Sequence, residues 1–503
     1  MRKTVISCIA AILAISIVPL LGAVERASAG PVTESEAVSV ADQWLAMELN
    51  TYAKVSDAER AQRLDGLRNR KVQYLVSRDQ VVEKPPKGAK VLAYVVKYDG
   101  GGYVVVSGDD RILPVIVFDL RSEFRWDLPE PNYMRYYLPR TMANRSKRVE
   151  SLEAKGEVVP VHRNWSRLRA QKLVSGGLSS ATFDATLGTT LLHWATASWS
   201  QGTFYNDVVI ANNGGIAGIP TGCTATAMAI QLKFHAWPDV GTGEHEYDDT
   251  KGDVTGHHWI NYGAQTFNWS AMPNSNLTGP NANVAVLMYV CGVAVDMNYE
   301  VGGSGAWPSE SVMDGCFRYR GTEEADMDHD RVIQMSVLAG LPTIASTTTH
   351  TVVVAGYRDT TAPYYYINAG HDGYLDGWYN FDTLPASDPT IDRSYPFSAP
   401  DTYRYADAAW AGPENGALDY PYNTVGEAVS AVPSGGRLWF KAANYNGTGN
   451  VPATFNKPMA ITSHQGIANV GGKIALRHKE GDGITYKDLP TIKISGSGMV
   501  KVY

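Results

Sequence analysis

Cys223 and His350 are the side chains of this sequence that are best suited to covalent chemistry. Cys223 opens an apolar run with helical spacing, TGCTATAMAIQLKFHAWP, which ends at Trp237-Pro238. A thiol at the N-terminus of a helix lies beside unpaired N–H groups, which favour the nucleophilic thiolate. The run therefore predicts a buried helix that begins with a nucleophile. A cysteine that only fills space in a buried helix has the same local pattern.

A cysteine that attacks a carbonyl carbon needs a base, a group that orients the base, and donors for the oxyanion. His350 precedes a β-branched run that ends at Gly356, so we expect it at the mouth of a strand. Asn368 ends a second strand-like run, and the turn between the two runs favours neighbouring antiparallel strands. Gln201 lies in a loop upstream of the thiol. Its amide and the N–H of Cys223 are candidate oxyanion donors.

The N-terminus has the pattern of a secretory signal peptide over residues 1–29. Arg2 and Lys3 precede an apolar segment, and Ala27-Ser28-Ala29 forms a small-residue cleavage site. We therefore expect an exported protein, located outside the cell, at the cell surface or in the periplasm. No stable membrane insertion is expected after signal removal.

Charge and cysteine content narrow the class further. The 503-residue chain has a net charge of -7 and a pI near 5.9, so it lacks the basic surface of a nucleic-acid-binding protein. Signal removal leaves Cys223, Cys291 and Cys316, an odd number, so at least one thiol is free or pairs between molecules. Cys223 is our choice for the free thiol. The sequence is equally compatible with a disulfide between Cys291 and Cys316 and with two buried free thiols.

Residues 30–175 read as a small α+β unit without a catalytic grouping. Thr33 and Glu36 form a capping box before a helical apolar stripe, and strands are expected over 91–98 and 103–106 around a glycine turn. Basic residues gather between 145 and 172, where we expect a solvated charged face. The segment from Arg163 to Ser180 has the composition of an accessible linker, so we expect a precursor to be cut there.

Two other kinds of site fit parts of the sequence. His245, His257 and His258 cluster with Glu244 and Glu246, but no HExxH spacing occurs, which disfavours a metal hydrolase. Adjacent histidines on a strand also point to opposite faces. The alternating aspartates of 326–330 lack the glycine and the distal glutamate of a calcium loop.

Four blocks of the chain resemble, in order, the streptopain family of papain-like cysteine endopeptidases. They are WSQGTFYND (199–207), the run that begins TGCTATAMAI, LMYVCGVAVDMNYEVGGSGA (287–306), and HTVVVAGY followed by YYYINAG. The first unit resembles the propeptide of that family, notably in GYVVVSGDDRILPVIVF (102–118). The resemblance implies an α+β fold and a protease made as a zymogen. It also implies protein or peptide substrates, inhibition by the chain's own propeptide, and no cofactor.

The resemblance assigns roles to individual residues. Cys223 is the implied nucleophile, His350 the base, Gln201 the oxyanion donor and Asn368 the group that orients His350. No metal ligand is implied. The residues assigned to the substrate-binding cleft are Gly222, Ser304 and Gly305.

One departure concerns the residues after Asn368. The family continues Asn-Trp-Gly-Trp-Gly, whereas this chain has Ala369, Gly370, His371 and Asp372. The missing indole normally shields the orienting hydrogen bond from water, and such bonds are stronger in a low dielectric. We expect its loss to affect the rate more than the reaction class.

The implied division of the chain has four parts. They are a signal peptide over 1–29, an inhibitory propeptide domain over 30–175, a papain-like peptidase domain over 185–400, and a β-rich region over 401–503. In the last region Thr424 and Glu427 cap a short helix, and strands are expected over 437–442 and 458–462. This region resembles the opening coils of right-handed β-helix proteins.

A different function remains open beside the protease. The β-helix-like tail, the 28 tyrosines and the 12 tryptophans also fit a catalytically weakened, protease-like surface or carbohydrate-binding protein. In such a protein Cys223 would be inert. A thiol-directed protease inhibitor should label Cys223 in a protease and not in such a protein, so labelling distinguishes the two functions.

Overall fold

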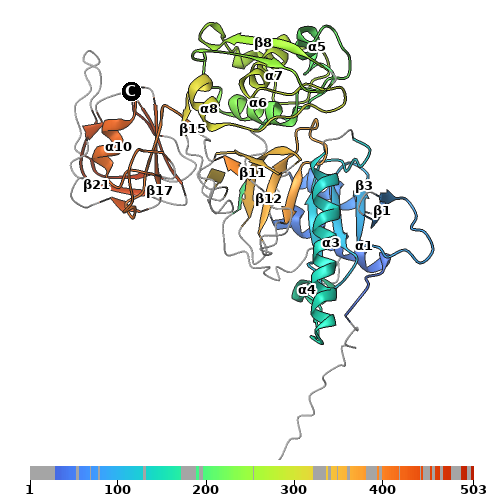
Figure 1. The fold of residues 1–503 in the computed structure, drawn as a ribbon. Helices are drawn as coiled ribbons and strands as arrows, with labels where there is room; N and C mark the ends of the chain where they lie inside the picture. Colours follow the sequence, from blue (N-terminus) through green and yellow to red (C-terminus); the bar gives the residue numbers. More distant parts are fainter. Residues whose placement is uncertain are drawn as a thin grey trace, which may run out of the picture.

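The chain has a mixed α and β architecture in which one long sheet links the first two units and a smaller unit follows (Figure 1). The expected α+β class is confirmed. The computed structural model describes residues 29–51, 56–128, 132–170, 189–191, 196–320, 333, 336–337, 341–380 and stretches between 393 and 502, apart from 68, 78, 79, 253, 348 and 359–362 within these ranges.

Three expectations lie outside the described residues. They concern residues 1–28 of the signal peptide predicted over 1–29, the Ser-Gly-rich stretch within 171–188 and the aspartates of 326–330. Among the described residues, no helix has both the length and the apolar character that a bilayer crossing requires.

The first unit is an antiparallel sheet covered by helices. The predicted capping box is present, because the Thr33 N–H donates to the Glu36 carboxylate at 3.0 Å and the Glu36 N–H donates to the Thr33 hydroxyl at 3.3 Å. The predicted glycine-turn hairpin is also present as β3 and β4. The elements are α1 (Glu34–Thr51), α2 (Asp57–Gly66), β1 (Arg70–Ser77), β2 (Gln80–Val82), β3 (Ala93–Tyr98), β4 (Tyr103–Ser107), β5 (Val115–Asp119), α3 (Tyr133–Ala154) and α4 (Arg163–Ala170).

The second unit has a helical half and a sheet half. In the helical half, α6 and α7 pack around a separate apolar core, while β10 to β14 belong to the sheet half. The elements are β6 (Thr189–Leu191), α5 (Asp207–Asn212), α6 (Cys223–His235), β7 (Glu244–Asp249), β8 (Gly256–Asn261), η1 (Tyr262–Ala264), η2 (Trp269–Ala271), α7 (Ala282–Ala294), α8 (Glu310–Phe317), β9 (Tyr319–Arg320), β10 (Thr343–Ser346), β11 (Thr351–Arg358), β12 (Tyr364–Asn368), β13 (Gly377–Asn380), β14 (Arg393–Tyr395) and β15 (Ala399–Pro400).

One sheet runs through both units. Its strand order in the described residues is β14-β10-β11-β12-β13-β5-β4-β3-β1-β2, and β6 pairs with β11. The units meet where β13 of the second pairs with β5 of the first, with Trp378 opposite Phe118. Figure 1 shows the orange strands β11 and β12 in line with the blue strands β1 and β3. The first unit is therefore built into the sheet of the second.

Buried polar contacts reinforce the junction between these units. Glu48 of α1 forms a two-pronged ion pair with Arg358 of β11, at 2.6 and 3.1 Å, and both side chains are almost fully buried. Arg145 of α3 donates to the Asn380 side chain at 2.8 Å. Arg145 was expected on a solvated face, and its burial corrects that expectation. A charge buried at a junction needs a partner, and both arginines have one.

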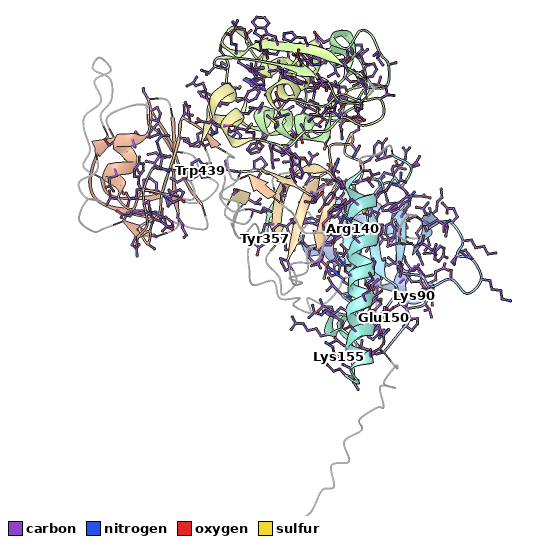
Figure 2. All side chains as sticks on the ribbon, in the orientation of Figure 1. Lys90, Arg140, Glu150, Lys155, Tyr357 and Trp439 are labelled. Atoms are coloured by element: carbon purple, nitrogen blue, oxygen red, sulfur yellow. The ribbon has the colours of Figure 1, made fainter. Side chains whose placement is uncertain are left out.

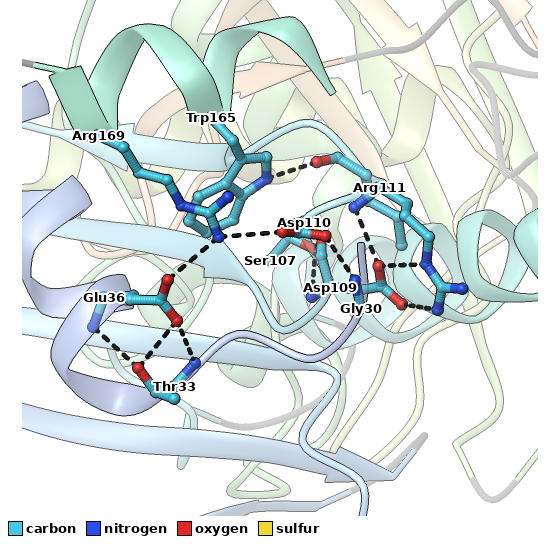
Figure 3. Close-up of polar contacts among 10 residues, drawn as sticks. Gly30, Thr33, Glu36, Ser107, Asp109, Asp110, Arg111, Trp165 and Arg169 are labelled. Atoms are coloured by element: carbon cyan, nitrogen blue, oxygen red, sulfur yellow. Dashed lines mark hydrogen bonds and ion pairs between the residues drawn. The ribbon is translucent and has the colours of Figure 1, made fainter. Parts of the chain in front are cut away.

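The first part of the expected linker is a packed helix. Arg163–Ala170 form α4, and its Trp165 is fully buried. Arg169 lies between Glu36 and Asp110, at 3.1 and 3.0 Å (Figure 3). The expectation of a flexible segment was therefore wrong from 163 to 170. Apolar Trp165 and Leu168 make one face of this basic stretch part of the core.

The described residues between 403 and 502 form a separate β-rich unit. Thr424 caps α10 as predicted, by accepting a hydrogen bond from the Glu427 N–H at 3.3 Å. Strands β16, β17 and β20 pair in parallel and in register, as stacked coils of a β-helix do. The elements are β16 (Tyr403–Ala406), α10 (Val425–Ala431), β17 (Gly436–Lys441), β18 (Asn444–Tyr445), β19 (Thr454–Phe455), β20 (Met459–His464), β21 (Ala468–Leu476), β22 (Leu489–Ile494) and β23 (Val500–Val502).

Aromatic side chains of the last unit contact the second one. Trp439 lies on the side of the orange unit that faces the rest of the chain (Figure 2). It belongs to an apolar cluster with Tyr405 and Leu341, and Tyr403 lies edge-on to His235 of α6. The last unit therefore packs on the second one through these aromatic side chains.

Two buried carboxyl groups lie at the β5–β13 junction. Asp119 ends β5 and accepts the N–H groups of Arg121 and Ser122, both at 2.7 Å. Asp376 precedes β13 and accepts the Ala369 N–H at 2.8 Å. Burial raises the pKa of Asp376 from 3.8 to about 8, with a further contribution from the charge of Asp119, and burial also raises the pKa of Asp119.

The stability of the full chain is expected to fall as pH rises from about 4 to about 8. A folded-state pKa above the unfolded value means that the folded chain holds a proton that the unfolded chain releases over this window. One such group lowers the free energy of unfolding by at most about 1.4 kcal/mol per pH unit. Urea unfolding of Asp376→Asn at several pH values should show a shallower fall. The exposed Asp57→Asn is the control, and an equal slope in both variants would contradict the assignment.

Candidate active site

The thiol of Cys223 lies at the first residue of α6, where the sequence predicted it. The helix ends at His235, before Trp237-Pro238, and is buried over most of its length. Gly222 precedes the thiol with φ of 89°, and a Cβ there would lie 2.7 Å from the Met297 side chain and 3.2 Å from the Ser304 carbonyl oxygen. Only glycine satisfies both the backbone angle and the space.

The surroundings of the thiol favour its neutral form in this state of the chain. Cys223 is buried, and burial raises the pKa of the thiol, against the effect of hydrogen bonds from Thr351 and Thr224. The Thr351 N–H donates to Sγ at 3.4 Å. The helix N-terminus was expected to favour the thiolate. In this state of the chain, removal of water from the thiol acts against that effect.

The sequence left open whether Cys291 and Cys316 form a disulfide. No disulfide joins Cys291 of α7 and Cys316 of α8 in the structure, and Cys223 is also free. Burial raises the pKa of both Cys291 and Cys316. Cys291 is fully buried, and a buried thiol of this kind is inert.

Gln201 and Cys223 line one small pocket, which has no room for a water molecule. Asn368 and Thr351 line it as well. Gln201 is buried, and its backbone carbonyl accepts the Thr221 N–H at 2.9 Å. Within the described residues, Oε1 of Gln201 has no hydrogen-bond partner. The structure thus brings the expected oxyanion donor to the expected nucleophile.

His350 lies in the tight turn between β10 and β11. Thr347 holds this turn, because its hydroxyl accepts the His350 N–H at 3.1 Å and its own N–H donates to the His350 carbonyl at 2.8 Å. The imidazole is buried, and its Nε2 lies 3.3 Å from the Ala369 carbonyl oxygen. A carbonyl oxygen only accepts, so Nε2 carries a proton in this contact. The next residue along, Thr351, is the one that contacts the thiol.

Asn368 lies on the strand beside His350, as predicted. Strands β11 and β12 are antiparallel neighbours, with Val353 opposite Asn368. The Asn368 amide donates to the Ala197 carbonyl at 2.9 Å and accepts the Gly370 N–H at 3.1 Å. In this form the carbonyl that receives His350 Nε2 is that of Ala369, not the Asn368 side chain. An orienting role for Asn368 therefore stays a prediction for the processed chain.

Tyr133 of α3 is a contact that sequence reasoning missed. Its ring lies 6.2 Å from the His350 ring, at an angle of 28° between their planes. Tyr133 also packs against Tyr379 of β13. The first unit therefore touches the expected base directly. No local signal marks Tyr133, since its role depends on how α3 docks. The same holds for Thr351, which sits in an ordinary β-branched run.

Truncation of Tyr133 is expected to loosen this contact in the uncut chain. Tyr133→Ala removes the ring that packs on His350, so Cys223 should react with iodoacetamide about tenfold faster than in the parent. Tyr136→Ala, on the same helix and under Arg140, is the matched control and should leave the rate unchanged. Equal rates in Tyr133→Ala and the parent would show that Tyr133 does not restrain the site.

The residues expected in the substrate-binding cleft come together beside α6. Ser304 is buried and its hydroxyl donates to the Pro220 carbonyl at 2.7 Å, which ties its loop to the segment before Cys223. Gly305 exchanges two backbone hydrogen bonds with Asn298, each of 3.0 Å. Gly222 lies against Ser304. Whether they bind substrate stays a prediction.

The histidine cluster of the sequence lies on the β7–β8 hairpin, away from these residues. His245 pairs with Asp296 at 2.6 Å, and His257 pairs with Asp248 at 2.8 Å. His258 is buried and contacts the Tyr289 hydroxyl at 3.0 Å. In the part of the chain that the structure describes, no group of three or more acidic, histidine or cysteine side chains could hold a metal ion.

Comparison with known families finds two matches that follow each other along the chain. Residues 199–379 match the model of the Peptidase C10 family. Residues 29–140 match the model of the Spi protease inhibitor. The first match includes Gln201, Cys223, His350 and Asn368, and the second includes Glu48 and Tyr133.

Several known proteins are similar to this chain. The thiol protease/hemagglutinin PrtT of Porphyromonas gingivalis is 26% identical in an alignment of 304 residues that covers 58% of this chain and 31% of PrtT. Streptopain of Streptococcus pyogenes is 22% identical in an alignment of 326 residues that covers 58% of this chain and 75% of streptopain. The chain thus spans less than a third of PrtT and three quarters of streptopain. A solved prointerpain A fragment from Prevotella intermedia is 19% identical, with a TM-score of 0.45, and covers 65% of this chain and 97% of the fragment.

Proposed function

We propose that the chain is a secreted endopeptidase of the peptidase C10 type, made as a zymogen, with Cys223 as its nucleophile. Residues 199–379 match the Peptidase C10 family model, and a match to the Spi protease inhibitor precedes them. One observation carries this proposal. The thiol at the head of α6 accepts the N–H of Thr351, so the turn that carries His350 lies directly against the nucleophile. Gln201 lines the same pocket.

The proposed reaction uses these groups in sequence. His350 and Cys223 form an imidazolium–thiolate pair, and the thiolate attacks the peptide carbonyl carbon. The Cys223 N–H and the Gln201 amide donate to the oxyanion of the tetrahedral intermediate. The His350 imidazolium then gives its proton to the leaving amine, and water releases the acyl group. Asn368 is proposed to orient His350 once the propeptide region has left.

The inhibitor region is proposed to keep this chemistry off through Tyr133, which packs on His350. In the same state of the chain Cys223 is buried, and burial raises the pKa of its thiol. The cut that ends this state is proposed to fall within 171–188. Residues 163–170 belong to α4, whose buried Trp165 makes them a poor protease substrate.

The predicted signal peptide supports export, and streptopain and PrtT are the relatives that guide the substrate class. Proteins or peptides are the proposed substrates. The domain limits at 175, 185 and 400 stay proposals.

Cleavage of an unfolded protein tests the proposal. The chain purified after secretion is incubated with the substrate before and after the cut, with and without an irreversible thiol-directed inhibitor. We expect cleavage only after the cut, and none with the inhibitor. Cleavage that survives complete inhibition, or no cleavage by the cut chain, would contradict the proposed function.

A further inference from the structure

His371 is a second buried histidine that lies against the imidazole of the proposed base. The ring centroids of His350 and His371 are 5.7 Å apart, and the ring planes are 7° from parallel. The exposed fractions are 2% for His350 and 7% for His371. Two buried imidazoles this close repel each other when both are charged. A charge on His350 therefore disfavours a second charge on His371.

The loop of His371 is anchored to the peptidase region itself. The Asp372 N–H donates to the Trp199 carbonyl at 3.2 Å, and the Tyr205 hydroxyl donates to the Asp372 carboxylate at 2.7 Å. Trp199 and Tyr205 flank Gln201. Tyr133, the other ring on His350, comes from the propeptide region. Loss of that region therefore removes Tyr133 from His350 and leaves His371 in place.

We propose that His371 is a positioning residue for His350: its neutral ring lies against the imidazole in the processed enzyme, holds it toward Cys223 and stabilises its protonated form. The inference rests on the proposed function, because it assigns a partner to the proposed base. The face of a neutral aromatic ring attracts a cation within about 6 Å of its centroid. A parallel ring also limits rotation of the imidazole about its side-chain bonds.

Several ionisable groups belong to the elements that carry or contact the two rings. They are the Cys223 thiol on α6, the Tyr133 phenol on α3, the Asp372 carboxyl in the same loop, and the Asp376 carboxyl, which accepts the Ala369 N–H. The Asp372 carboxylate accepts the Tyr205 hydroxyl, and the Asp376 carboxyl accepts the Ala369 N–H. Burial raises the pKa of both carboxyl groups. The ring that lies parallel to the His350 imidazole is that of His371.

Two substitutions test the inference in the processed enzyme. His371→Ala removes the ring, and His371→Phe keeps a flat ring that never carries a charge. We expect His371→Ala to lower kcat at least about tenfold, with KM within about twofold of the parent. In the pH profile of kcat/KM for His371→Ala, we expect the basic limb to move to lower pH by about half a pH unit. His371→Phe should keep the basic limb of the parent and most of its kcat. His257→Phe, an exposed histidine on β8, is the control.

Three outcomes would overturn the inference. The first is a His371→Ala enzyme whose kcat and whose basic limb are the same as those of the parent. The second is a loss of kcat in His371→Phe as large as that in His371→Ala. The third is a basic limb that moves to lower pH in His371→Phe, and this outcome decides if His371→Ala does not fold.

The rate of Cys223 alkylation by iodoacetamide, measured over the same pH range, separates this inference from the proposed function. The processed parent could cleave no peptide while the pH profile of Cys223 alkylation differs between His371→Ala and the parent. In that case the proposed function fails and the inference stands. If the parent cleaves peptides and neither profile shifts, the inference fails alone.

Discussion

Replacement of Cys223 by alanine is expected to lower peptide cleavage by the processed chain at least about a thousandfold. The acyl transfer needs a thiolate that forms a covalent bond with the substrate carbonyl, and no other described group in the Gln201 pocket can take that role. Binding of the peptide should change little, because alanine fits the space of the thiol. The loss should therefore appear in kcat.

Cys291→Ala is the matched control for this substitution. Cys291 is also a buried, free cysteine on an apolar helix, but it belongs to α7 and does not line the pocket. Cleavage of a fluorogenic peptide by both variants, after the propeptide region has been cut by the same added protease, gives the comparison. Equal activity of Cys223→Ala and Cys291→Ala would remove Cys223 from the mechanism.

Loss of the Glu48 carboxylate is expected to destabilise the uncut chain by about 3–5 kcal/mol. Glu48→Ala leaves the Arg358 guanidinium buried between Trp378 and Phe118, whose ring centroids lie 4.7 and 5.5 Å away, without its carboxylate partner. Burial raises the pKa of Glu48 even though Arg358 lies beside it. Formation of the pair in the interior is therefore costly, and the large effect appears only when one partner is removed.

Urea unfolding of the full chain measures this effect, and Glu150→Ala serves as the control. Glu150 forms an exposed pair with Lys90 at 2.9 Å, on the outside of the first unit (Figure 2). Pairs of that kind contribute about 0–1 kcal/mol. Glu48→Ala should also speed the reaction of Cys223 with iodoacetamide, because Glu48 and Arg358 join the inhibitor region to β11. Similar unfolding midpoints for Glu48→Ala and Glu150→Ala would show that the buried pair does not hold the two regions together.

Local patterns predicted the elements that carry the site. The apolar run after Cys223, the β-branched run after His350 and the capping box at Thr33 each specify their structure within a few residues, and all three are present. Helical spacing, strand alternation and cap chemistry depend on near neighbours in the sequence.

Features that depend on docking could not be predicted in this way. The pairing of β13 with β5 and the contact of Tyr133 with His350 join residues that are far apart in the chain. The raised pKa of the Cys223 thiol follows from its burial, whereas the sequence revealed only the helix N-terminus. In α4 the basic residues suggested a solvated linker, although Trp165 and Leu168 supply a buried face.

Site-resolved labelling tests the central claim most directly. The uncut and the processed chain are treated with an irreversible thiol-directed protease inhibitor, and mass spectrometry locates and times the label. We expect one label, at Cys223, that forms at least about ten times faster in the processed chain. Labelling spread over Cys291 and Cys316, or a rate at Cys223 that does not change when the propeptide region is removed, would contradict a thiol protease held latent by its own N-terminal unit.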